Sequence, residues 1–407
     1  MNKILIKNIG ELLTGRNGSL EVLQSKELLL SGGKIESIGN SGEFSEEDCE
    51  VMNAGSSLVT PGLVDAHTHL VFFGTREDEF EMRIKGASYM EIANAGGGIR
   101  KSVSMLRDAS EDDLVEHSLP YLENMLRHGT TTVEVKSGYG LSLKDELKSL
   151  RALKRLNEMQ KVDLVPTFLG AHEFPDEYRG AHSTDREKYI EIIINEMIPA
   201  VVEERLAEFC DVFTEEGVFT VAESERILTA ASDAGLGLKL HAEEFEPIGG
   251  AELAARLKAV SADHLVAISD EGIRSMKEAD VTPVLLPGTT FFLGSDTYAP
   301  ARKMIDAGLR PAIATDFNPG SSMTESLQII LTIACQKLKL TPLEAFEGVT
   351  LNAAKALNRS DSIGSLERGM KADIVIWNAE NHKQIPYHYG VNNVRTVIKG
   401  GEVVFSD

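Results

Sequence analysis

Histidine and aspartate side chains stand at the ends of several segments whose composition is typical of buried strands. His67 and His69, in the sequence His-Thr-His, end the first of these segments. His241, His264 and Asp316 end three others. Residues two apart on a strand point to the same face, so His67 and His69 are expected to aim in the same direction. Three imidazoles and one carboxylate form a ligand set for a metal ion that also binds a water molecule.

These side chains can meet only if the segments that carry them belong to one sheet. Eight short apolar segments alternate with amphipathic helical patterns, such as 145–159 and 222–234. Apolar strands followed by helices are typical of a parallel sheet buried on both faces. Eight such units predict an α/β fold, a closed (β/α)8 TIM barrel, whose active site lies at the carboxyl ends of the strands. The predicted strands are 58–67, 131–135, 163–169, 209–213, 237–241, 259–264, 282–286 and 310–316.

Both ends of the chain have a different texture. Short strand-like runs occur at 4–6 and 28–30, and a Gly-Gly pair at 32–33 predicts a hairpin turn. The same pattern returns at 373–377, 394–399 and 403–405. We therefore expect the two termini to meet and to form one small β domain beside the barrel.

The composition limits the classes of partner. The 407 residues include 41 lysines and arginines against 63 aspartates and glutamates, which gives a formal net charge of -22. Such a field repels nucleic acid and anionic membranes, and no apolar stretch approaches the roughly 18 residues of a membrane span. We expect a cytoplasmic protein without nucleic acid or membrane partners. An anionic substrate would need cationic groups close to it.

Two stretches carry a resemblance to a known superfamily. The segment 61–69 (PGLVDAHTH) resembles the first-strand signature of the amidohydrolase superfamily, and 369–375 (GMKADIV) resembles the stretch that leads its chains back into their β domain. The resemblance implies a metal-dependent hydrolase barrel at 59–359 and a small β-sandwich domain built from both termini, 1–58 and 360–407. It also implies that the metal ligands are His67, His69, His241 and Asp316.

The number of metal ions can be predicted from the fourth strand. Many members of that superfamily hold two ions bridged by a lysine carbamate at the end of this strand. Here the region 211–216 reads DVFTEE and contains no lysine. We therefore predict one metal ion per chain, zinc or iron, since both accept three imidazoles and a carboxylate. Water bound to the ion would have a lowered pKa and would act as the nucleophile.

Five motifs at strand ends are together similar to the imidazolonepropionase family. They are 69–76 (HLVFFGTR), 135–141 (VKSGYGL), 169–173 (LGAHE), 241–244 (HAEE) and 316–321 (DFNPGS). The resemblance implies hydrolytic ring opening of 4-imidazolone-5-propanoate to N-formimidoyl-L-glutamate in histidine degradation. Phe73 departs from the family pattern, which more often has a small residue beside Gly74, and could narrow the mouth of the site near Arg76.

The resemblance also implies how the small anionic substrate is bound. Arg76 would form paired hydrogen bonds with its carboxylate, helped by Tyr139, His172 and Tyr89. An alternative for Arg76 is a salt bridge to the acidic residues 77–79. The residues expected to bind the ring or the opened product are Glu244, Asn318, Gly320 and Ser321.

The expected catalytic residues are Glu244, His264 and Asp316. Asp316 or His264 would take the proton of the attacking water, and the sequence leaves open which of them is the base. His264 would also stabilise the oxyanion. Glu244 would assist proton transfer as the ring C–N bond breaks.

Two other functions remain open at this point. Another mononuclear amidohydrolase, such as a nucleobase or heterocycle deaminase, would share the metal ligands, Glu244 and His264. Arg76, Tyr139 and His172 argue against it, because a neutral base has no carboxylate to bind. A catalytically inactive scaffold protein would need a lost ligand, and each expected ligand is present in the sequence. A homodimer is expected by analogy with the family alone.

Overall fold

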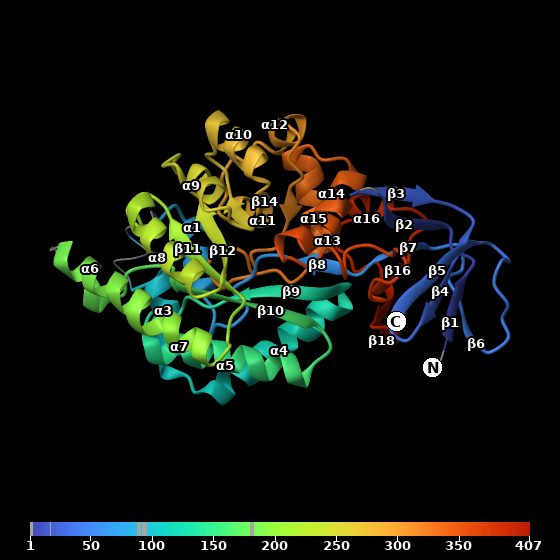
Figure 1. Cartoon of the computed structure of the whole chain (residues 1–407), viewed down its shortest axis with the longest axis horizontal. Coiled ribbons are helices and arrows are strands. Elements are labelled where there is room, and N and C mark those ends of the chain that lie inside the picture. The colour runs from blue at the N-terminus through green and yellow to red at the C-terminus, as the bar shows by residue number, and fades with distance from the viewer. Residues whose placement is uncertain (1–2, 17, 88–90, 92–95, 180–182) are drawn as a thin grey trace.

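The chain folds into a helix-covered barrel and a smaller β part that contains both termini, as Figure 1 shows. This computed structural model describes every residue except 1–2, 17, 88–90, 92–95 and 180–182. Tyr89, an expected substrate contact, lies outside the described residues. Among the residues that are described, none of the helices has the length and apolar character needed to cross a membrane.

The larger part is the predicted barrel. Its eight strands are hydrogen-bonded in the order β15-β14-β13-β12-β11-β10-β9-β8, and all neighbours run parallel. The strands are β8 (Leu63–Asp65), β9 (Thr130–Lys136), β10 (Asp163–Ala171), β11 (Phe209–Thr214), β12 (Gly237–Ala242), β13 (Ser261–His264), β14 (Thr282–Leu285) and β15 (Ala312–Ile313). The (β/α)8 fold is therefore confirmed.

The first and last strands close the barrel through the segments that follow them. The amide of Asp316 donates to the carbonyl of His67 at 3.0 Å, and the amide of His69 donates to the carbonyl of Phe317 at 2.9 Å. The Asp65 carboxylate accepts from the amide of Thr315 at 3.0 Å and from its hydroxyl at 2.6 Å. Closure therefore brings His67 and His69 beside Asp316.

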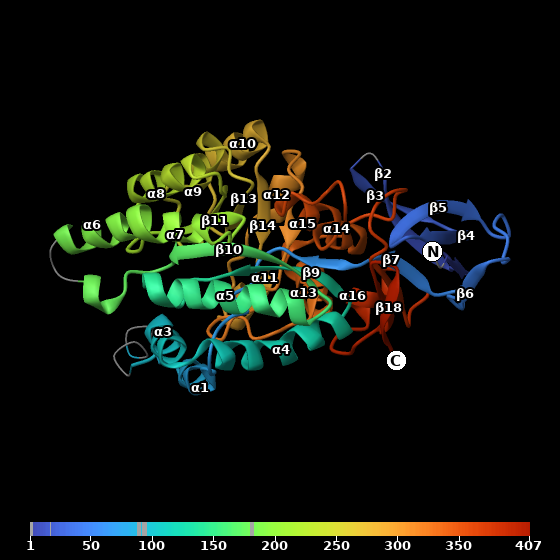
Figure 2. The ribbon, with the colours of Figure 1, turned by 60° about the horizontal axis from the view of Figure 1, so that its bottom comes forward.

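Helices cover the outside of the barrel, and polar residues fix where several of them begin. Ser110 and Asp113 form a capping box at α4, and Thr220 and Glu223 form one at α8. Figure 2 shows α4 and α5 side by side below β9 and β10. The helices are α1 (Glu77–Ile84), α3 (Ile99–Asp108), α4 (Glu111–Arg127), α5 (Leu143–Met159), η1 (Asp176–Tyr178), α6 (Ser183–Ile192), η2 (Ile193–Met197), α7 (Ile198–Glu203), α8 (Val221–Asp233), α9 (Gly250–Arg256), α10 (Asp270–Ala279), α11 (Pro287–Phe292), α12 (Ala301–Asp306), α13 (Leu327–Ile333), η3 (Ala334–Leu338), α14 (Pro342–Gly348), α15 (Leu351–Ala356) and α16 (Gln384–Tyr387).

The smaller part is a β-sandwich made by both ends of the chain, as expected. One sheet has the order β5-β4-β1-β6, and the other has the order β18-β17-β16-β7-β2-β3. Their strands are β1 (Lys3–Lys7), β2 (Glu11–Arg16), β3 (Ser19–Leu23), β4 (Lys26–Ser31), β5 (Lys34–Asn40), β6 (Cys49–Asn53), β7 (Leu58–Pro61), β16 (Ile374–Trp377), β17 (Val394–Lys399) and β18 (Glu402–Ser406). Apolar residues from both sheets, including Ile6, Leu28, Val59 and Ile374, pack into a common core.

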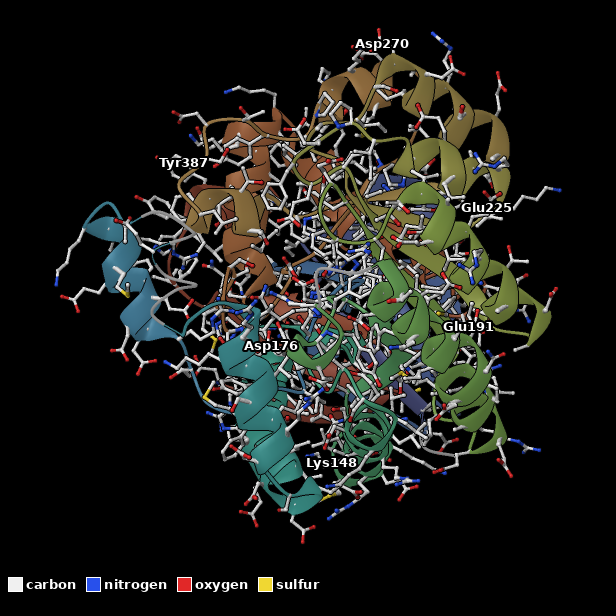
Figure 3. The ribbon with its side chains drawn as sticks, turned by 90° about the vertical axis from the view of Figure 1, so that its left-hand side faces the viewer. Lys148, Asp176, Glu191, Glu225, Asp270 and Tyr387 are labelled. Atoms are coloured by element: carbon white, nitrogen blue, oxygen red, sulfur yellow. The ribbon has the colours of Figure 1, made fainter. Side chains whose placement is uncertain are left out.

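The site lies at the barrel end that points away from the sandwich. β9 starts next to the sandwich, because a Cβ placed on Gly129 would lie 3.2 Å from Val375. The carboxyl ends of the parallel strands therefore face the opposite way. Figure 3 looks at the molecule from that side, where Glu191, Glu225 and Asp270 mark the outer helices.

The predicted strand 58–67 is wrong as a single element. It is two strands in different sheets: β7 belongs to the sandwich and β8 to the barrel, with Gly62 between them. Gly62 is required at this crossing, since a Cβ there would lie 2.3 Å from Oγ1 of Thr131. The predicted domain boundary between 58 and 59 falls inside β7, and the division into two domains stays a prediction. The predicted strand 310–316 is shorter, since β15 spans two residues.

We expect Trp377→Ala to lower the free energy of unfolding by about 3–5 kcal/mol, the usual cost of truncating a buried aromatic residue. Trp377 is fully buried, donates from Nε1 to Oγ1 of Thr60 at 2.9 Å and packs edge-on against Phe346. Urea denaturation followed by circular dichroism measures the change. Tyr387→Ala is the control, because Tyr387 is 85% exposed and its loss should cost less than about 0.5 kcal/mol. Equal effects of the two substitutions would contradict the packing described.

Candidate metal centre

Four predicted ligands gather at the carboxyl rim of the barrel. Nε2 of His69 lies 3.3 Å from Nε2 of His67 and 3.3 Å from Nε2 of His241. Oδ1 of Asp316 lies 3.5 Å from Nε2 of His67 and 3.6 Å from Nε2 of His69. All four residues are buried. The structure therefore brings together donor atoms from separate regions of the sequence.

These separations fit a single bound ion. Ligand atoms placed tetrahedrally at about 2.0–2.1 Å from an ion lie about 3.3–3.4 Å from one another. Four of the distances among the ligand atoms are within a few tenths of an ångström of that value. His264 and His172 also lie close enough to form three-residue groups with these ligands, His264 with His67 and His241, and His172 with His69 and His241. The donor set therefore suits a divalent metal ion.

Buried carboxylates hold two of the imidazole rings. Nδ1 of His67 lies 2.7 Å from Oδ2 of Asp263, and Nδ1 of His241 lies 3.1 Å from Oδ1 of Asp211. A carboxylate that accepts from Nδ1–H leaves the lone pair on Nε2, which is the tautomer that binds a metal ion. His69 is fixed differently: its ring stacks on that of His172 at a centroid distance of 5.0 Å. Within the described part of the chain, Nδ1 of His69 has no hydrogen-bond partner.

The protonation states also favour metal binding. Burial lowers the pKa of His67 and His69 well below the usual range of histidine, so both rings are neutral at neutral pH. Burial raises the pKa of Asp316 to about 6, although the Thr289 hydroxyl, which donates to Oδ2 at 2.5 Å, opposes this shift. Asp316 is therefore largely ionised at neutral pH and presents Oδ1 to the imidazoles.

His264 and Glu244 form the predicted pair of proton-transfer groups beside the ligands. Nδ1 of His264 lies 3.6 Å from Oε2 of Glu244, and the His264 ring lies 5.2 Å from that of His241. Burial lowers the pKa of His264, while burial and the charge of Asp316 raise the pKa of Glu244. Both groups are therefore biased toward their neutral forms, and a proton on Glu244 can be donated.

Three strand ends of the site have left-handed backbone at residues other than glycine. The φ angles are 56° at Glu243, 74° at His264 and 52° at Asp316. Such angles cost of order 1–3 kcal/mol each and persist only where the surroundings impose them. Here they occur directly after β12, at the last residue of β13 and three residues after β15, at the rim that carries the proposed ligands.

Tyr139 and His172 line the site beside His69. The Tyr139 ring lies 5.9 Å from that of His69 and 5.5 Å from that of His172. Its loop is held by Glu146, a buried carboxylate that accepts from the amides of Gly138, Gly140 and Leu141 at 2.8–3.1 Å. His172 is oriented by a 3.0 Å hydrogen bond between Nδ1 and the carbonyl of Gly138.

Arg76 is paired with an acidic neighbour, as the alternative interpretation allowed. Its Nε and Nη2 donate to Glu79 at 3.0 and 2.7 Å. The other edge of the guanidinium faces Gly320, where a Cβ would lie 2.3 Å from Nη1. A second arginine, Arg83, donates from Nη2 to the Gly320 carbonyl at 3.0 Å. Two cations therefore flank the loop that follows Asp316.

That loop is ordered by Asn318. Oδ1 of Asn318 accepts from the amides of Gly320 and Ser321 at 2.8 Å each, and its Nδ2 donates to the Asp316 carbonyl at 2.6 Å. The predicted binding residues Asn318, Gly320 and Ser321 therefore lie together and adjoin both Asp316 and Arg76. The ring of Phe73 lies 5.3 Å from the ring of His117 on α4.

Sequence reasoning did not identify the residues that hold the ligands. Asp211 and Asp263 were part of predicted strands, and only their inward position near strand ends could have marked them. Arg83 and Glu146 lie on α1 and α5, and the sequence of these helices gave no signal for a role at the rim.

Comparisons with known proteins agree with the fold. Residues 58–404 match the sequence model of the amidohydrolase family. An imidazolonepropionase of Bacillus velezensis is 50% identical to this chain and covers 99% of it, with 97% of the relative matched. One from Alkaliphilus oremlandii is 48% identical and covers 98% of the chain, with 97% of the relative matched. The chain therefore belongs to the amidohydrolase family and, within it, to the imidazolonepropionases.

A solved structure with a different activity has the same fold. The 5-methylcytosine deaminase from Klebsiella pneumoniae, liganded with 5-fluorocytosine, has a TM-score of 0.75 and covers 99% of this chain, with 98% of its own chain matched. Its sequence is 18% identical. A likeness at this identity shows the shared barrel and sandwich and carries no argument about the substrate.

We expect His241→Ala to reduce the metal content of the purified, reconstituted protein from about one ion per chain to a small fraction of that. The substitution removes one of the four donors and the ring that Asp211 holds. Inductively coupled plasma mass spectrometry measures the content. His117→Ala is the matched control, because His117 lies on α4 against Phe72 and Phe73. Equal metal contents in the two variants would show that His241 is not a ligand.

Proposed function

We propose that this chain hydrolyses 4-imidazolone-5-propanoate to N-formimidoyl-L-glutamate, a step of histidine degradation that cleaves a ring C–N bond of a cyclic amide. One observation carries the proposal: the metal centre and two arginines adjoin the same loop, since Asp316 contributes a donor and Gly320 adjoins both Arg76 and Arg83. The substrate has the matching pair of groups, a ring carbonyl and a carboxylate.

The centre would hold one metal ion per chain, zinc or iron, through His67, His69, His241 and Asp316. The donor distances support a single ion, and the lack of a lysine in 211–216 argues against a carbamate-bridged pair. When bound, such an ion supplies Lewis acidity, which makes a water molecule nucleophilic at neutral pH and polarises a carbonyl group.

Arg76 would bind the propionate group. Glu79 occupies the Nε and Nη2 edge, so the Nη1 edge beside Gly320 is the one that meets the substrate. Arginine forms strong, directed hydrogen bonds with carboxylates. Tyr139 and His172 would close the other side of this pocket. Burial raises the pKa of Tyr139, which keeps its hydroxyl protonated as a donor, although the charge of Arg76 acts in the opposite direction.

Asp316 would act on the attacking water and His264 on the oxyanion that its attack produces. Asp316 is ionised at neutral pH and can accept the proton, and Thr289 holds its Oδ2. His264 would donate to the oxyanion that forms on the ring carbonyl. Glu244, protonated by virtue of its buried position, would then deliver a proton to the leaving ring nitrogen.

Asn318 and Ser321 would bind the ring or the opened product at the same rim. Gly320 contributes by its lack of a side chain, since a Cβ would displace Arg76. The net charge of -22 supports a cytoplasmic enzyme without nucleic acid or membrane partners. Homodimer formation stays a prediction.

Deamination of a nucleobase is the alternative function, because deaminases share the barrel. The paired arginines beside Gly320 disfavour it, since a neutral base offers no carboxylate to two guanidinium groups. The 50% identity to an imidazolonepropionase over nearly the whole chain also supports ring opening.

We expect the metal-loaded enzyme to consume 4-imidazolone-5-propanoate, seen as a loss of its ultraviolet absorbance, and to stop when a chelator is added. The chelator removes the Lewis acid that the reaction needs. Adding back zinc or iron should restore the rate. Ammonia release from guanine or cytosine, with no ring opening, would favour the deaminase alternative and refute the proposal.

Substitution Arg76→Gln should lower kcat/KM about 10- to 100-fold, mainly through KM, because it removes a charge-assisted hydrogen bond to the propionate. Steady-state kinetics measure the effect. On an analogue with a propionamide in place of the propionate, the same substitution should change little. Arg226→Gln is the matched control, since Arg226 pairs with Glu187 and Glu191 on the outer surface. An equal loss on both substrates would rule out carboxylate binding by Arg76.

A further inference from the structure

A cluster of charged side chains fills the barrel beneath the metal centre. Five of its members are fully buried: Glu134, Lys136, Asp211, Lys239 and Asp263. They come from β9, β11, β12 and β13, where alternate residues point into the barrel. Burying charges is costly unless they are paired, so the cluster requires a reason. The proposed reaction uses none of the five directly.

Lys136 contacts three of the carboxylates. Its Nζ lies 2.7 Å from Oδ2 of Asp211, 2.9 Å from Oε1 of Glu134 and 3.2 Å from Oδ2 of Asp263. Although burial alone would lower the pKa of Lys136, the three carboxylates raise it above its usual range, so the ammonium stays charged. One cation therefore bridges carboxylates from two other strands.

The two aspartates it bridges are those that hold the metal ligands. The second oxygen of Asp211 binds Nδ1 and the amide of His241, at 3.1 and 3.0 Å. Oδ2 of Asp263 binds Lys136 and Nδ1 of His67, and Ser261 donates to its Oδ1 at 2.7 Å. Lys136 is thus two contacts away from His67 and from His241 along separate paths.

Lys239 occupies a comparable position with a different set of contacts. It is also fully buried, its Nζ lies 3.0 Å from Oε2 of Glu134, and it donates to the Ala356 carbonyl at 2.8 Å. Within the described part of the chain, its ion pair is with Glu134. The cluster therefore contains two buried lysines, of which one contacts the aspartates behind the ligands.

We propose that Lys136 is a positioning residue of the metal centre, whose ammonium fixes Asp211 and Asp263 so that these carboxylates fix the direction and tautomer of His241 and His67. Two carboxylates around one ammonium would repel each other without it, and each would turn away from the ring it holds. His67 and His241 would then lose the acceptors at Nδ1 that keep their Nε2 lone pairs directed at the same ion. The inference rests on the proposed function, because it takes these histidines as ligands.

The test compares two lysine substitutions of equal size and burial. Lys136→Met and Lys239→Met each remove a buried ammonium and keep the length of the side chain. Competition with a chromogenic zinc chelator measures the metal dissociation constant of each variant. We expect Lys136→Met to weaken zinc binding about 10- to 100-fold, the usual effect of losing support behind a metal ligand. Lys239→Met should change zinc affinity by less than about threefold.

A second pair of variants removes the risk that an unpaired buried carboxylate prevents folding. Lys136→Met with Glu134→Gln, and Lys239→Met with Glu134→Gln, each remove one positive and one negative charge and leave both aspartates in place. Thermal denaturation of the metal-free proteins reports the structural cost, which should be similar for the two double variants. The loss of zinc affinity should again follow Lys136.

Two outcomes would overturn the proposal. One is zinc affinity in the Lys136 variants equal to that of the unsubstituted enzyme. The other is an equal loss in the Lys136 and Lys239 variants, which would reduce Lys136 to a buried charge needed for stability. In either case, an unsubstituted enzyme that binds zinc and opens the imidazolone ring would leave the proposed function intact.

Discussion

The close approach of several lone pairs at a buried site is the constraint on which the rest of this structure depends. Four of the distances among three imidazole nitrogens and one carboxylate oxygen are 3.3–3.6 Å, and all four side chains are buried. Such a group repels itself unless a cation lies among its members. The imidazoles and the buried Asp316 are costly to bring together without an ion and favourable around one. Many contacts at the rim hold these side chains in place.

Successive groups of residues inside the barrel hold these side chains in place. The proposed ligands lie at the rim, carboxylates on β11 and β13 hold two of them, and Lys136 contacts both of those carboxylates. Closure of the sheet supplies the remaining geometry, since the backbone bonds between 67–69 and 316–317 set His67 and His69 beside Asp316. Beside the same rim, Arg76 and Arg83 adjoin Gly320, and Glu79 pairs with Arg76. The loop after β15 therefore adjoins both the proposed metal ligands and the two arginines.

The sequence was sufficient for the barrel, because strand ends were marked by residue type and helices by their period. The patterns at 145–159 and 222–234 match α5 and α8 within a few residues. The four proposed ligands could be singled out in the sequence because they follow apolar strands. Lys136 and its partners were not, since a lysine in a short strand does not show that three carboxylates will enclose it after closure. The break at Gly62 was missed because both halves are apolar, and the contact with Thr131 that demands glycine exists only in three dimensions.

The passage from β7 to β8 through Gly62 has a consequence for how the molecule can be divided. A single residue separates a strand of the sandwich from the first barrel strand, which ends two residues before His67. The barrel and the sandwich are therefore not joined by a flexible linker at this point. A chain shortened to the barrel alone would begin at β8, without the sandwich strand β7 that precedes it. The proposed ligands His67 and His69 would then follow a strand at the free end of the chain. An insertion near Gly62 would likewise shift β8 relative to β7, so the barrel and the sandwich cannot be separated here without disturbing the strand that leads to His67.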